Sequence, residues 1–168
     1  MQEIKRSGVL GVGLMAFGAL VFGRLPTLFV FVMFIGGLWQ VLKAADLYAK
    51  ATGSLALIRS CVWGLGALVV ASVCCIIAIS TSTNSWWMAA SVAFLVCGLF
   101  FCAVGVLLWQ LSGFVGFFVG SVLLCAVAGL FGGLLQDASS LLYAVFTLLG
   151  FGLHAWGWWK IAPQKAEK

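Results

Sequence analysis

The sequence predicts an all-α integral membrane protein with six transmembrane helices, arranged as three glycine-rich helical hairpins with both termini in the cytoplasm. Hydrophobic residues make up 64% of the 168 residues and charged residues 8%, whereas about a quarter of the residues in a soluble domain are charged. Six apolar stretches approach the roughly 17 to 25 residues that a helix needs to cross a bilayer. A glycine motif also returns about every 50 residues, which marks a repeated structural unit.

The six spans are expected near residues 7–23, 26–43, 58–80, 86–109, 112–134 and 138–159. They pair into hairpin repeats at approximately 7–43, 58–109 and 112–160, within a single transmembrane domain that covers 1–168. Little of the chain is left for a soluble domain, so we expect one domain only.

The first hairpin turns at Arg24-Leu25-Pro26. Pro26 suits the first position of the returning helix, because the N–H that proline lacks would have no partner there. The sequence around this turn has no small-residue cleavage pattern, so we expect the first span to remain as an uncleaved helix.

The link between the first and second hairpins allows two interpretations. Residues 44–57 hold Asp46 and Lys50 among apolar residues, which suits a short helix in the membrane interface. Gly53-Ser54 favours a break instead. The second hairpin turns through the uncharged polar run at 80–85, and the third turns near Gln136-Asp137.

Charge and tryptophan positions predict the orientation. With six crossings, eight of the nine basic residues lie in the cytoplasm, as the positive-inside rule requires; these are Lys5, Arg6, Lys43, Lys50, Arg59, Lys160, Lys165 and Lys168. Tryptophans fall near the predicted membrane interfaces, with Trp39, Trp63, Trp109, Trp156, Trp158 and Trp159 at the cytoplasmic side and Trp86 and Trp87 at the outer side. This distribution accounts for the net charge of +5 without a nucleic-acid partner.

The repeated motif has the spacing S-x-x-x-G-x-G and predicts helix packing, since small residues let helices approach closely in lipid. Its first two copies are complete, whereas Phe118 replaces the last glycine of the third, where Gly120 extends the groove. The predicted packing residues are Ser7, Gly11, Gly13, Ser60, Gly64, Gly66, Ser112, Gly116 and Gly120. The groove serves either packing within one subunit or contact with another subunit.

The sequence offers little chemistry. We expect no catalytic residue, cofactor or metal, because acids are absent from the predicted span interiors and the six cysteines lack C-x-x-C spacing. His154 is a candidate for pH sensing or proton relay, although it occupies the ring position that Trp39 and Phe100 fill in the other hairpins, which favours packing. Arg24 and Asp137 are the charges expected outside, where they either pair or remain separately solvated.

Taken together, Gly11, Gly18, Pro26 and Gly36-Gly37 of the first hairpin resemble the HdeD family of bacterial acid-resistance membrane proteins. The resemblance implies a six-helix protein of the bacterial cytoplasmic (inner) membrane with a role in acid or general stress tolerance, and it assigns no catalytic residues. We therefore expect a non-enzymatic membrane protein surrounded by lipids. The alternatives are a small channel or carrier, and an accessory subunit of a larger membrane complex or a homo-oligomer.

Overall fold

The computed structural model describes residues 1–21, 25–131 and 139–162, and the secondary structure in these ranges is entirely α-helical. Six helices lie where the sequence predicts them: α1 Gln2–Leu20, α2 Thr27–Thr52, α3 Leu55–Thr81, α4 Asn84–Ser112, α5 Gly116–Phe131 and α6 Ser139–Lys160. Within the described residues, Leu55–Ala78, Asn84–Ser112 and Leu141–Lys160 are long and apolar enough to cross a membrane, and Gly116–Val127 is a shorter apolar helix. The chain is thus a helical protein of membrane-compatible composition.

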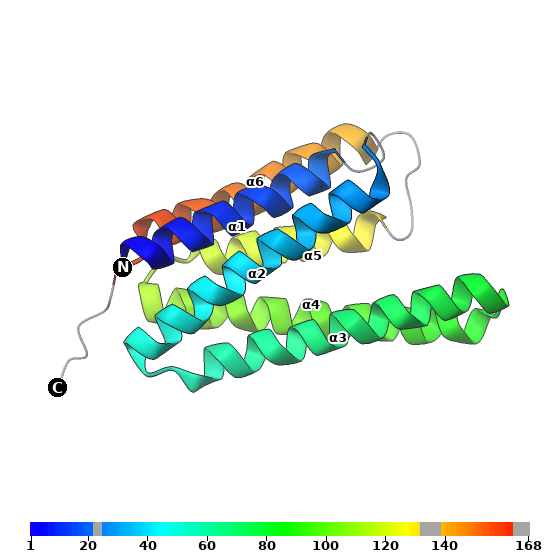
Figure 1. The fold of residues 1–168 in the computed structure, drawn as a ribbon, viewed down its shortest axis with the longest axis horizontal. Helices are drawn as coiled ribbons and strands as arrows, with labels where there is room; N and C mark the ends of the chain where they lie inside the picture. The colour runs from blue at the N-terminus through cyan, green and yellow to red at the C-terminus, as the bar shows by residue number, and fades with distance from the viewer. Residues whose placement is uncertain (22–24, 132–138, 163–168) are drawn as a thin grey trace.

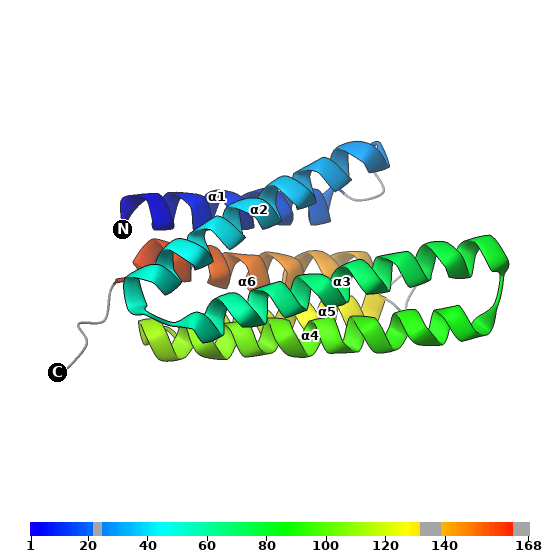
Figure 2. The same cartoon turned by 60° about the horizontal axis from the view of Figure 1, so that its bottom comes forward.

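Consecutive helices pack as hairpins, α1 with α2, α3 with α4, and α5 with α6. The hairpins are joined because α6 also packs on α1 and α4 also packs on α5. As Figures 1 and 2 show, the α5–α6 hairpin therefore lies between the other two. Helices α2 and α3 contact each other much less extensively and diverge from the link that joins them.

One end of the bundle holds the N-terminus, the α2–α3 link and the end of α6 (Figure 1). The main buried cluster lies at this end, and all six helices contribute to it; its members are Ile4, Val12, Ala44, Ala45, Tyr48, Ala49, Leu57, Leu108, Phe117, Trp158 and Ile161. The Tyr48 hydroxyl donates a hydrogen bond of 2.7 Å to the carbonyl oxygen of Leu111, which joins the end of α2 to the end of α4. The bundle is thus held most firmly at one end.

Glycine ends two of the helices close to this cluster. Helix α2 continues through most of the predicted link and stops at Gly53, whose φ of 72° is left-handed. The structure therefore has the break at Gly53-Ser54 and not a separate interfacial helix. Gly113, also at φ 72°, ends α4 one residue after Ser112.

The helix boundaries at Ser112 and Pro26 differ from the sequence prediction. Ser112 is the last residue of α4 and not the first of the fifth helix, and its hydroxyl donates to the carbonyl oxygen of Leu108 at 2.5 Å. Pro26 lies one residue before α2, where its carbonyl oxygen accepts the N–H of Phe29 at 2.9 Å. Both residues complete the hydrogen bonding of a helix end.

The first hairpin closes through a reciprocal glycine contact. A Cβ added at Gly11 would lie 2.5 Å from the Gly37 carbonyl oxygen, and one added at Gly37 would lie 2.6 Å from the Gly11 carbonyl oxygen. Gly13 and Gly36, on the same two helices, have open space where a Cβ would be. The two backbones can approach this closely only because residues 11 and 37 have no side chain.

Gly11→Ala and Gly37→Ala should therefore each destabilise the protein by about 1–3 kcal/mol, as overpacked core positions do. Gly13→Ala and Gly36→Ala are the matched controls, and they should leave stability unchanged or slightly raised because alanine favours helix. Unfolding in mixed micelles, followed by circular dichroism, measures all four variants. Equal stabilities for the two pairs would contradict this assignment of the crossing point.

Candidate functional site

The hydroxyl of Ser121 and the imidazole of His154 meet between the last two helices. Ser121 of α5 is 3% exposed, and its Oγ lies 3.0 Å from Nε2 of His154 on α6. The same hydroxyl donates a hydrogen bond of 2.9 Å to the carbonyl oxygen of Phe117. Because a hydroxyl has a single proton, its oxygen is left to accept the Nε2–H of a neutral histidine. The pair is thus satisfied without a formal charge.

Glycines on α4 and α5 make room for this pair. A Cβ at Gly105 of α4 would lie 2.5 Å from the Ser121 Oγ. A Cβ at Gly120 would lie 2.8 Å from the His154 ring and 2.9 Å from the carbonyl oxygen of Gly150. Helices α4, α5 and α6 therefore converge on the Ser121–His154 pair, which we name the polar cluster.

Phe117 connects the polar cluster to the buried end of the bundle. Its side chain is fully buried, and its ring centroid lies 5.6 Å from that of His154 and 5.5 Å from that of Trp158, both in edge-on geometry. Trp158 is also fully buried and lies edge-on to Tyr48 at 6.5 Å. Among the described residues its indole N–H has no hydrogen-bond partner. The sequence analysis missed Phe117, although the small residue Gly157 that faces its ring is a signal in the sequence.

The predicted packing residues fall into different environments. Gly11 and Gly120 lie at helix crossings, a Cβ at Gly64 would meet Phe100 at 3.2 Å, and Ser7 is buried. Gly13 and Gly66 face open space, and Gly116 lies against the ring of Phe114, two residues earlier in the chain. Ser60 is half-buried, and Ser112 belongs to the end of α4 as described above.

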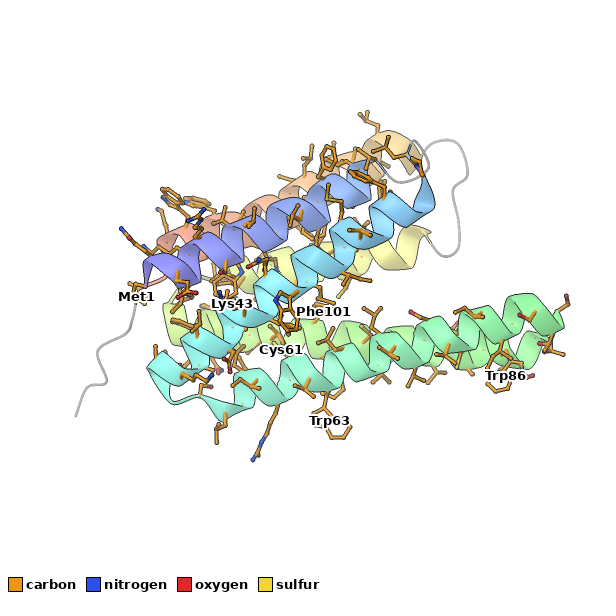
Figure 3. The ribbon with its side chains drawn as sticks, in the orientation of Figure 1. Met1, Lys43, Cys61, Trp63, Trp86 and Phe101 are labelled. Atoms are coloured by element: carbon orange, nitrogen blue, oxygen red, sulfur yellow. The ribbon has the colours of Figure 1, made fainter. Side chains whose placement is uncertain are left out.

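The structure does not test the two charges that were expected outside, but it places most of the tryptophans. Arg24 and Asp137 lie outside the described residues. Trp39, Trp63 and Trp159 are strongly exposed, and Figure 3 shows Trp63 pointing away from the bundle and Trp86 at the end of the α3–α4 hairpin far from Met1. Trp158 differs from these exposed rings in being fully buried.

An ion pair joins α1 to α2 at the end that holds the N-terminus. Lys43 Nζ lies 2.8 Å from Glu3 Oε1, and both side chains are substantially exposed. The hydrogen bond from Lys43, reinforced by its charge, holds the pKa of Glu3 below its usual value. The attraction between Glu3 and Lys43 is complete at a pH above the ordinary carboxyl pKa. It is lost only as the pH falls through the lowered pKa of Glu3.

The described cysteines include one close pair, Cys102 of α4 and Cys125 of α5, with 3.7 Å between their sulfur atoms. Across the described residues, no three histidine, cysteine, aspartate or glutamate side chains are grouped in a way that could hold a metal ion. Comparison with protein-family models, with curated proteins and with solved structures found no match.

The Ser121–His154 hydrogen bond should be measurable in a double-mutant cycle of Ser121→Ala and His154→Phe. Interhelical hydrogen bonds in membrane proteins average about 0.6 kcal/mol in such cycles, so we expect a coupling energy of this size in unfolding measurements. Ser72→Ala is the control, because the Ser72 hydroxyl is exposed and bonds only to the Leu68 carbonyl of its own helix at 2.9 Å. Additive effects of the two substitutions would show that the pair does not couple α5 to α6.

Proposed function

We propose that this chain crosses the bacterial cytoplasmic membrane six times with both termini inside, and that it acts without catalysis in acid or general stress tolerance, as the HdeD resemblance implies. The observation that carries the proposal is the chemical nature of the helix contacts. The backbone crossings at Gly11–Gly37 and Gly120–Gly150 and the packing of Phe117 against Phe114 and Trp158 involve groups that do not titrate. Such contacts keep their strength when the pH falls.

The distribution of charge supports the orientation. Lys5, Arg6, Lys50 and Arg59 belong to the helix ends that meet beside the N-terminus and the α2–α3 link. The Glu3–Lys43 ion pair lies at the same end. A membrane protein places such a basic end on the cytoplasmic side.

The few carboxylates also suit a protein that works in acid. Acid unfolding arises mainly from carboxylates that are paired in the folded state and must take up protons. The chain has four acidic residues in total, and the described pairs, Glu3–Lys43 and Asp46–Lys50, are partly exposed at the periphery. Exposed ion pairs contribute only about 0 to 1 kcal/mol each to folding stability. Protonation of these carboxylates therefore removes little of the protein's stability.

Deletion of the gene should lower survival after acid shock at least several-fold, and expression of the wild-type protein should restore it. Gly11→Leu is the variant to compare with Gly13→Leu, because the first disrupts the crossing at Gly37 and the second enters open space. Only the Gly13→Leu protein should restore survival when both are expressed at equal membrane levels. Unchanged survival of the deletion strain after acid, heat and oxidant treatment would overturn the stress role.

A small channel or carrier is the second candidate, and the polar cluster is the observation that favours it. His154 is a titratable side chain within a helix long and apolar enough to cross a membrane, and such residues often take part in proton or ion pathways. Its ring contacts Ser121 and Phe117 and lies beside Gly120, so conduction would require these neighbours to move.

Proton flux into proteoliposomes separates the two candidates. If the protein acts in stress tolerance without transport, the proton flux of vesicles with the wild-type protein should equal that of empty vesicles. The His154→Phe substitution should then leave this flux unchanged. Flux well above that of empty vesicles, lost in His154→Phe and retained in the control Trp156→Phe, would instead establish the transport role. A pH-sensitive dye trapped inside the vesicles reports the flux.

A further inference from the structure

Two thiols face each other across the contact between the second and third hairpins. Cys102 of α4 and Cys125 of α5 have their sulfur atoms 3.7 Å apart. The Cys125 thiol also lies 3.5 Å from the carbonyl oxygen of Gly98, to which it donates a weak hydrogen bond. Both cysteines are half-buried, whereas Cys97 on the same α4 helix is buried.

The backbone brings these thiols together through a tight crossing one turn away. Gly105 follows Cys102 by three residues, and Ser121 precedes Cys125 by four, so each lies on the same helix face as its cysteine. A Cβ at Gly105 would lie 2.5 Å from the Ser121 Oγ. This close approach of α4 and α5 fixes the separation of the two sulfur atoms.

The surroundings decide which chemistry suits the pair. Two thiolates can bind a soft cation such as Cu(I), but that complex would leave one negative charge inside a membrane span, which is unfavourable. The described residues offer no group of three metal-binding side chains that includes the pair. A disulfide is neutral and needs no further ligand. The apolar location therefore favours oxidation of the pair over metal binding.

We propose that Cys102 and Cys125 form a reversible dithiol–disulfide site that a lipid-soluble two-hydrogen acceptor, a quinone or a diazene, oxidises. Two S–H bonds break and one S–S bond forms, and two protons and two electrons pass to the acceptor, so that a quinone becomes a quinol. The sulfur atoms approach from 3.7 Å to about 2.05 Å. Two small thiol molecules restore the dithiol by exchange and are themselves oxidised to a disulfide. The Cys102–Cys125 disulfide joins α4 to α5 covalently. The site does not depend on the proposed stress role.

The test uses the full-length reduced protein in phosphatidylcholine vesicles, at a ratio of protein to lipid that leaves most vesicles with one copy. The membrane-permeant diazene diamide is added, and the protein is then denatured in SDS with N-ethylmaleimide to alkylate the remaining thiols. Intact mass counts the alkyl groups. The reduced chain should take up one group on each of its six cysteines, and oxidation should remove two of these groups.

Serine variants identify the cysteines that pair. Cys102→Ser and Cys125→Ser should lose no alkyl groups on oxidation, whereas Cys61→Ser and Cys97→Ser should still lose two. Alanine variants at 102 and 125 repeat the measurement, and circular dichroism with size-exclusion chromatography verifies that each variant folds. The proposal fails if the oxidised wild type keeps all its alkylation sites, or if Cys102→Ser still loses two. Loss of the disulfide in Cys97→Ser would overturn it equally, because the pair would then involve Cys97.

Discussion

The insertion of large rings into the space above glycines is the interaction on which the rest of the structure depends. A side chain at Gly8 of α1 would collide with the Trp158 ring, and one at Gly157 of α6 would lie 2.5 Å from the ring of Phe117. In lipid, apolar contact with neighbouring tails is as favourable as contact with another helix, so helices associate through close packing and hydrogen bonds. Rings that fill glycine surfaces provide a large contact area without strain. These two contacts join α1, α5 and α6 at the end of the bundle where all six helices contribute to the buried cluster, while α2 and α3 diverge away from it.

The sequence predicted the six helices well, because hydropathy and length are strong signals for apolar helices. It predicted the individual contacts less well, and the S-x-x-x-G-x-G motif shows the reason. Successive helical residues are about 100° apart, so two glycines separated by one residue lie on nearly opposite faces. Gly11 accordingly faces α2, whereas Gly13 faces open space. Gly37 makes the contact that completes the crossing, and it lies outside the motif. Which face of a helix meets a neighbour depends on how the hairpins are arranged, which the period of the motif does not encode.

Residues at equivalent sequence positions of two hairpins have different environments, because the two helices present different faces to their neighbours. Trp39 and His154 both follow a glycine and a leucine on the second helix of a hairpin. Trp39 is 70% exposed, because it lies on a face of α2 that none of the described helices covers. His154 packs against Ser121 and Phe117, because it lies on the face of α6 that meets α5, the other helix of its own hairpin. A repeated sequence therefore produces one exposed ring and one interhelical polar contact.

Two positions along α5 contact different helices by different means. Near its start, Phe117 contacts Trp158 and His154, so this end is fixed by rings that neither oxidation of thiols nor protonation of carboxylates affects. Two turns further along, Cys125 meets Cys102, where the contact with α4 is a pair of thiols that chemistry can alter. A covalent link between Cys102 and Cys125 would join α4 to α5 about two turns beyond the contact of Phe117 with Trp158.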